Sequence, residues 1–159
     1  MNYYTNYLNL FNYECLRLFA KLYSERNLSS ADILGGIRLS ALLFTFCIAS
    51  SASLIESFNE DISGWDVSNA TDMRCMFSGA RAFNQHLAAW NVSGVTNMGC
   101  MFYDAYAFNQ PLNEWDVSNV NDMSVMFFDA NAFNQPIGSW NVSKVTCMEY
   151  MFQRATAFN

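Results

Sequence analysis

Histidine is nearly absent from this chain, since His86 is the only one among 159 residues. Nucleophilic catalysis by a triad depends on a histidine held between two partners, so one turn histidine leaves little scope for it. The five cysteines form no C-x-x-C pair, which argues against a zinc site. A glycine-rich phosphate loop is also missing from the sequence. We therefore expect no enzyme activity, no metal and no cofactor.

Charged residues are scarce at 14%, and the net charge is −6. Residues 1–57 carry as many Lys and Arg as Asp and Glu, so the whole acidic excess lies in residues 58–159. Nucleic-acid binding is dominated by Lys and Arg contacts to phosphate. The acidic balance therefore excludes nucleic acid as a partner, and it argues against docking of this part on an anionic membrane.

A repeat of 25 residues fills residues 58–159. Its units begin at residues 58, 83, 108 and 133, and a fifth has only begun at 158. Each unit contains one tryptophan, one Met-Phe pair and one Phe-Asn pair. A fixed period of this size indicates a stacked array, in which one unit cannot bury its apolar face alone. The predicted core residues are Trp65, Trp90, Trp115, Trp140, Met76, Phe77, Met101, Phe102, Met126, Phe127, Met151 and Phe152.

Two periodicities occur within each unit. The Trp-x-Val segment has the two-residue alternation of a strand with one buried face. Further on, Met98, Met101, Phe102 and Ala105 follow the i, i+3, i+4, i+7 spacing of a helical stripe. Each unit is therefore predicted to be a short parallel strand, a turn, and a short helical segment.

The unit W-[DN]-V-S-x-V-[TN]-x-M-x-x-M-F-x-x-A-x-x-F-N-Q carries a family resemblance. Its apolar-x-x-apolar-x-apolar start is the strand pattern of leucine-rich repeats. Over residues 58–159 the chain resembles the BspA-type leucine-rich-repeat family, in particular its mycoplasma-lipoprotein-like branch. The resemblance implies a right-handed α/β solenoid. It also implies a surface-exposed or secreted protein that acts in cell adhesion or protein binding.

Polar positions beside each predicted strand indicate a binding surface on the concave side of the solenoid. Such a face would recognise a protein, a glycan or a cation; the alternative is a hydrated strand face without a ligand. The candidate residues are Asp66, Ser68, Asn91, Ser93, Glu114, Asp116, Ser118, Ser139, Asn141 and Ser143.

Two further groups of residues carry predictions. The asparagines that follow each Phe of the Phe-Asn pairs form a column, which we expect to bond backbone groups left unpaired at turns. The outer turn around Tyr103 and Tyr106, with Phe128 one unit on, is a second candidate contact patch. These aromatic side chains would alternatively cover the helical side of the solenoid.

Cys75 and Cys100 occupy the same position in adjacent units. Neighbouring strands lie about 5 Å apart, which places the pair within reach of a disulfide. The sequence therefore leaves two alternatives: a pair of buried thiols, or a disulfide whose formation depends on the redox compartment.

Residues 1–57 are a different kind of sequence. Ser29 and Asp32 form a capping pattern before a predicted apolar helix over residues 33–55. Three interpretations stay open for this segment: a membrane anchor, a secretory signal, or a helical cap packed on the first unit of the array. The first would bring residues 33–55 into contact with a membrane.

The function expected from these observations is a non-enzymatic binding or adhesion module, extracellular or on the cell surface. The alternative is a structural protein, soluble inside the cell, that associates end to end. That alternative depends on the C-terminal unit, because an uncovered end of a stacked array exposes core residues and unpaired backbone groups.

Overall fold

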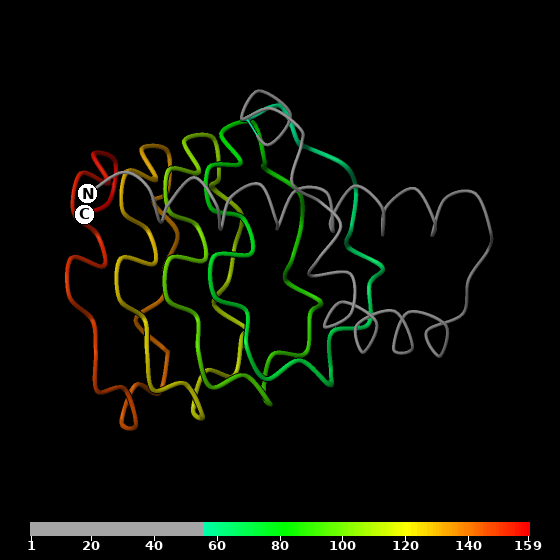
Figure 1. Cartoon of the computed structure of the whole chain (residues 1–159), viewed down its shortest axis with the longest axis vertical. Helices are drawn as coiled ribbons and strands as arrows, with labels where there is room; N and C mark the ends of the chain where they lie inside the picture. Colours follow the sequence, from blue (N-terminus) through cyan, green and yellow to red (C-terminus); the bar gives the residue numbers. More distant parts are fainter. Residues whose placement is uncertain (1–55) are drawn as a thin grey trace, which may run out of the picture.

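The structure is a computed structural model that describes residues 56–159 (Figure 1). Successive coils of the chain lie side by side in sequence order, from the cyan coil to the red one. Parallel backbone bridges join Asp72 to Asn97, Asn97 to Asp122, and Asp122 to Cys147, so equivalent positions form a row across the coils. Coils 1 to 4 are defined as residues 58–82, 83–107, 108–132 and 133–157.

The predicted α/β solenoid is wrong, because the described residues contain almost no regular secondary structure. Helical geometry is confined to Glu56, and strand geometry is confined to the four residues of the isolated bridges. Within residues 56–159 no sheet forms. Neither the strand predicted at each Trp-x-Val segment nor the helix predicted after it is present.

Hydrogen-bonded turns replace the predicted strand. In coil 2 the Trp90 N–H donates to the Leu87 carbonyl at 3.0 Å, and the Val95 N–H donates to the Val92 carbonyl at 2.9 Å. Each bond spans three residues and closes a β-turn. Trp90 and Val92 are both buried. The alternating pattern therefore reflects two consecutive turns that each direct an apolar side chain inward.

Left-handed residues replace the predicted helix. Cys100 and Asp104 have φ angles of 57° and 59°, whereas a right-handed helix needs negative φ at every residue. The Met101 N–H donates to the Met98 carbonyl at 3.2 Å and closes a turn with Cys100 at its third position. Positive φ at that position is the requirement of a type II turn. The other coils have positive φ at the same two positions: Cys75 and Gly79, Val125 and Asp129, Tyr150 and Arg154.

Most hydrogen bonds between coils in this second half of each unit run from one coil to the next, and only those at its two ends, such as Thr96 N–H to the Thr71 carbonyl and Ala107 N–H to the Arg81 carbonyl, run back. The Phe77 N–H donates to the Met101 carbonyl, and the Phe102 N–H donates to the Met126 carbonyl, each at 2.9 Å. Alternate residues repeat the arrangement, always from one coil to the next. We call the N–H groups of these alternate residues the donor row of each coil. The stack consequently has a polarity: the donor row faces the C-terminal end.

Phenylalanine rings form the centre of the core. The Phe102 ring stacks on Phe108 with a centroid distance of 4.0 Å, and on Phe77 and Phe127 at 5.4 Å. Offset stacking of aromatic rings adds stabilisation to that of their buried area. The residues predicted for the core lie in it, with Trp65, Met76 and Phe152 partly buried and the others buried.

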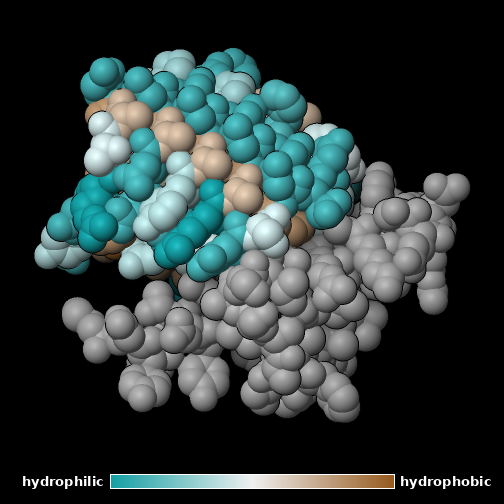
Figure 2. Space-filling model, turned by 90° about the horizontal axis from the view of Figure 1, so that it is seen from above, coloured by the Kyte–Doolittle hydropathy of each residue, from teal (hydrophilic) through white to brown (hydrophobic). Residues whose placement is uncertain are grey.

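Hydrophilic residues cover most of the face seen in Figure 2, and a single row of apolar residues runs along the stack between them. Surface character thus follows the coil repeat, because each position of the unit recurs at the same place on successive coils. The segment predicted over residues 1–57, including the helix at 33–55, lies outside the described residues except for its last two positions.

Candidate binding surface

A row of carboxylates and amides follows the tryptophans along the stack. This polar row consists of Asp66, Asn91, Asp116 and Asn141. Each side chain accepts a hydrogen bond at Oδ1 from the backbone N–H two residues later, for example from Ser118 to Asp116 at 3.0 Å. This bond makes an Asx turn, which fixes the direction of the side chain. The row therefore presents carboxylate and amide in alternation, once per coil.

Serine hydrogen bonds lower the pKa of both carboxylates of the polar row. Bonds from the side chain and backbone of Ser68 lower the pKa of Asp66 below its usual 3.8. The equivalent bonds from Ser118 lower the pKa of Asp116, and the positive charge of Lys144 adds to the effect. The row is therefore negatively charged at neutral pH.

The ten residues predicted for a concave strand face lie at the surface, but on turns rather than on strands. Asn113 connects two of them: its side chain donates to the Glu114 carboxylate, and its carbonyl accepts a bond from the Ser139 hydroxyl at 3.2 Å. The half-buried members are Asp66, Ser93 and Ser118, and the exposed ones are Ser68, Asn91, Glu114, Asp116, Ser139, Asn141 and Ser143.

The asparagine column bonds backbone groups between coils, which confirms that prediction. The Asn109 Oδ1 accepts the N–H of Asn134 at 2.9 Å and the Nε2 of Gln135 at 2.9 Å. The Asn84 Oδ1 accepts the N–H of Asn109 in the same way. These side chains are therefore committed to holding coils together and are not available for a ligand.

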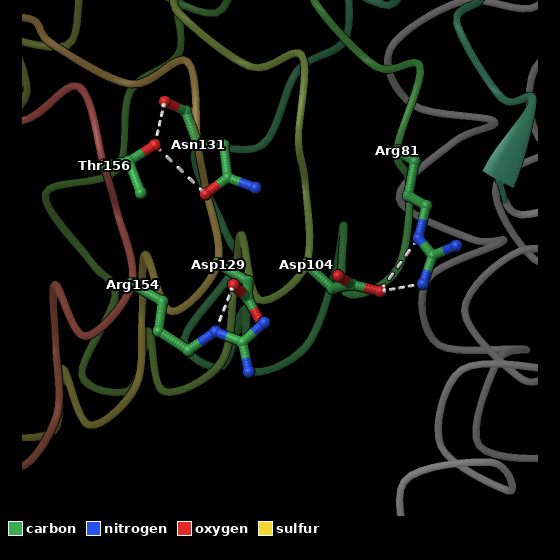
Figure 3. A network of polar contacts seen from close by, with 6 residues as sticks. All are labelled: Arg81, Asp104, Asp129, Asn131, Arg154 and Thr156. Carbon is green, nitrogen blue, oxygen red and sulfur yellow. Dashed lines mark hydrogen bonds and ion pairs between the residues drawn. The ribbon is translucent and has the colours of Figure 1, made fainter.

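Arginine–aspartate pairs, which sequence reasoning missed, also join neighbouring coils (Figure 3). Arg81 donates from Nε and Nη2 to Asp104 Oδ2 at 3.0 and 2.9 Å. Arg154 approaches Asp129 with 2.8 Å between Nε and Oδ1. Asp104 and Asp129 are the left-handed corner residues of their coils. The sequence signal was the acidic residue in place of Gly79 at this corner.

The second candidate patch is largely occupied by contacts within the chain. Tyr103 stacks on Phe128 with a centroid distance of 5.0 Å, and both are half-buried. The Arg81 guanidinium lies 4.8 Å from the centre of the Tyr106 ring. This cation–π contact and the stacking pair stabilise the outer corner. The aromatic residues therefore cover their own coils more than they offer a free contact surface.

Cys75 and Cys100 are both reduced, so of the two alternatives the structure has the thiol pair. Cys75 is buried and Cys100 is half-buried. The two thiols hydrogen-bond to each other, which raises the pKa of Cys75 and lowers that of Cys100. The third described cysteine, Cys147, lies at the bridge position opposite Asp122 instead.

Other functional groups are dispersed over the repeat. His86 is exposed on coil 2. Among residues 56–159, no three side chains of His, Cys, Asp or Glu gather closely enough to hold a metal ion. The same span contains no helix with the length and apolar character needed to cross a membrane.

A family model described as "Mycoplasma protein of unknown function, DUF285" matches residues 47–159. The chain belongs to this family, which is linked to BspA-like surface repeat proteins. Comparisons with curated proteins and with solved structures find no match.

Proposed function

We propose that the repeat region is a non-enzymatic binding or adhesion module of the BspA-like kind, displayed at the cell surface or outside the cell. The polar row is its recognition surface, and the ligand is a protein or a glycan. The observation that carries the proposal is the regular row of carboxylates and amides at the surface, whose directions are fixed by Asx turns. Membership of a family linked to surface repeat proteins supports it.

The chemistry of the row suits ligands rich in hydrogen-bond donors. Asp116 offers a carboxylate, and Asn141 on the next coil offers an amide. Sugar hydroxyls and protein N–H groups both pair with such acceptors. Since the spacing follows the coils, an extended ligand would meet the same group at regular intervals. Repeat proteins commonly bind extended partners through surfaces of this type.

A charge-neutralising variant tests the row without disturbing its turns. Asp66→Asn with Asp116→Asn makes all four positions asparagine, as at Asn91 and Asn141, and retains the Oδ1 acceptor. The full-length chain is screened on immobilised oligosaccharides and purified extracellular proteins, and the affinity of each hit is measured. We expect the variant to lose about tenfold or more in affinity, the effect of one lost charged hydrogen bond.

The matched control is Glu60→Gln with Asp61→Asn, which removes two carboxylates outside the row. Coil 2 carries Gln85 at the position of Glu60, and Asp61 makes the same Asx turn to the Ser63 N–H at 3.0 Å. This variant should bind like the unmodified chain. Equal losses in both variants, or the absence of any hit in both screens, would rule out recognition by the row.

A second candidate function is end-to-end association through coil 4. Val142, Met148 and Tyr150 are 40%, 41% and 64% exposed, whereas Val117 and Met123 at the equivalent positions of coil 3 are buried. The N–H groups of the coil 4 donor row have no acceptor among the described residues. These four groups belong to Met148, Tyr150, Phe152 and Arg154.

The polarity of the stack restricts this association. Pairing of two C-terminal ends is unfavourable, because the two donor rows would face each other. A second copy would have to offer the carbonyls of coil 1 that are equivalent to the acceptors of coil 2, and these belong to Asp72, Arg74, Met76 and Ser78. Asp72 and Arg74 are exposed, whereas Ser78 is buried.

Sedimentation velocity over a concentration series tests the second candidate. Tyr150→Lys places a charge in the exposed patch, and such charges block edge pairing. Ser139→Lys adds the same charge elsewhere on coil 4. Association that is lost in the first variant and kept in the second supports assembly through coil 4, and a monomer at every concentration refutes it.

A further inference from the structure

We propose that Cys75 and Cys100 are an oxidative modification site, at which exchange with a small-molecule disulfide such as oxidised glutathione forms a covalent cross-link between coils 1 and 2. The proposal is independent of ligand binding by the polar row.

The backbone places the two cysteines side by side. The Cys75 N–H donates to the carbonyl of Gly99, the residue before Cys100, at 2.9 Å. Hydrogen-bonded neighbouring segments lie about 4.8 Å apart, which is within the Cα separation of about 4.4 to 6.8 Å found in disulfides. Both cysteines have φ of 57°, so their side chains leave the backbone in the same direction. Parallel side chains keep the Cβ atoms about as far apart as the segments, so these atoms must approach by a few tenths of an ångström to reach the separation of about 3.5 to 4.5 Å found in disulfides.

The pair is unique among the cysteines of residues 56–159. The same position holds Val125 in coil 3 and Tyr150 in coil 4, so the column of thiols ends after Cys100. Cys147 lies three positions earlier in its own coil, in the bridge row. Oxidation of the described part of the chain therefore has one favoured product.

Exposure and acidity give the two thiols different roles. Cys100 is half-buried and Cys75 is 5% exposed, so a reagent in solution reaches Cys100 first. The hydrogen bond from Cys75 lowers the pKa of Cys100, which increases the fraction of thiolate there. Cys100 is consequently the attacking thiol, and Cys75 is the resolving thiol.

The exchange is balanced by one molecule of oxidised glutathione. The Cys100 thiolate attacks one glutathione sulfur, so a mixed disulfide forms and the first glutathione leaves as a thiolate. Cys75 then loses its proton to water and attacks the Cys100 sulfur, which displaces the second glutathione. Two protein thiols are oxidised by two electrons, and one glutathione disulfide is reduced to two thiols.

The cross-link should stabilise the repeat, because it closes a loop of one full coil in the unfolded chain. Engineered and natural disulfides of this loop size lead us to expect a rise in Tm of about 10 °C.

The test incubates the full-length chain in glutathione buffers from reducing to oxidising, then blocks remaining thiols and maps its peptides by mass spectrometry. We expect a linked Cys75–Cys100 peptide with the loss of two hydrogens, and a higher Tm in the oxidised sample. A map in which both thiols stay blocked at every ratio would overturn the proposal. Linkage of either cysteine to Cys15, Cys47 or Cys147 would overturn it as well.

Two variants separate the cross-link from other effects of oxidation. Cys75→Val with Cys100→Val copies the natural occupant of this position, Val125, and should show no redox dependence of Tm. Cys147→Val should retain both the linked peptide and the Tm shift. The peptide map of the unmodified chain decides the proposal even if a variant fails to fold.

Discussion

At the scale of single residues, side chains form many of the hydrogen bonds between coils that backbone groups form in a regular sheet. Asn109 accepts two hydrogen bonds from coil 4, and Trp115 donates from Nε1 to the Leu87 carbonyl at 2.9 Å. Buried or half-buried polar groups need such partners, because each unsatisfied group costs free energy. The recurring Asn, Gln and Trp of this repeat therefore belong to the stabilisation of the fold.

Asn109→Ala removes the acceptor of both bonds. We expect the free energy of unfolding to fall by about 1–3 kcal/mol, because the Asn134 N–H loses its partner, while Gln135 Nε2 keeps only its bond to the Asn109 carbonyl at 3.0 Å. Asn109→Asp keeps the Oδ1 acceptor, so its free energy of unfolding should fall by less. Denaturant titration measures the difference, with the exposed Asn113→Ala as control. Equal stability of all three variants would contradict a stabilising role for the asparagine column.

The acidity of Asp116 depends on two bonds from Ser118. Ser118→Ala removes the side-chain bond and keeps the backbone bond, so the pKa of Asp116 should rise toward 3.8. The stabilisation linked to this lowered pKa is present above the unfolded-state pKa and is lost as pH falls through the folded-state pKa. An NMR titration measures the shift; Asp66, which bonds Ser68 instead, is the internal reference.

At the scale of elements, turns rather than the predicted strands and helices direct the apolar side chains into the core. Each coil contains left-handed residues that a non-glycine side chain adopts at a cost of about 1–2 kcal/mol. Hydrogen bonds to the adjacent coil offset that cost, as at Cys100, whose N–H donates to the Ser124 carbonyl at 2.8 Å. The coil conformation is therefore a property of the stack, since an isolated unit would lack these bonds.

Phe102→Ala should destabilise the protein more than Phe152→Ala. Phe102 is fully buried, with stacked rings on both neighbouring coils, whereas Phe152 in coil 4 is partly buried and has such a neighbour on one side. We expect a loss of about 3–5 kcal/mol for Phe102→Ala, typical of an aromatic residue truncated in a core. Thermal or denaturant unfolding measures the stability of the two variants. A larger loss in Phe152→Ala would contradict the central place of Phe102 among the stacked rings.

At the scale of the whole molecule, the stack has two chemically different edges. Coils 1 to 3 donate from their donor rows to the next coil, and coil 4 has no such acceptor among residues 56–159. Protection of the backbone from solvent should therefore decrease toward coil 4, as in repeat proteins whose stability depends on nearest neighbours.

Hydrogen exchange tests this gradient. The amides of Tyr150 and Phe152 should exchange faster than those of Val125 and Phe127, which donate to the Glu149 and Met151 carbonyls at 2.8 Å. Because the four residues occupy equivalent positions, differences in local turn geometry largely cancel. Equal protection in coils 3 and 4 would indicate that coil 4 is covered in solution.

The candidate surface was predictable in its membership and not in its geometry. Asp66 and Asn91 recur at one position of the repeat, which suffices to place them in one row. That each side chain folds back on a serine N–H depends on a turn where the alternating pattern predicted a strand. The Arg81–Asp104 pair was missed because its members occupy different positions of adjacent units.

Periodicity alone determines which residues face inward, because an apolar side chain that recurs once per coil packs against the equivalent side chains of the neighbouring coils. Trp90 and Phe102 could be assigned to the core for that reason. Only the tertiary structure decides the backbone path. Cys100 has no local preference for a left-handed conformation, Asp104 has only the modest tendency of aspartate, and Gly79 is the only glycine at either position. Hydrogen bonds between neighbouring coils accompany this conformation, and they exist only once the coils have stacked.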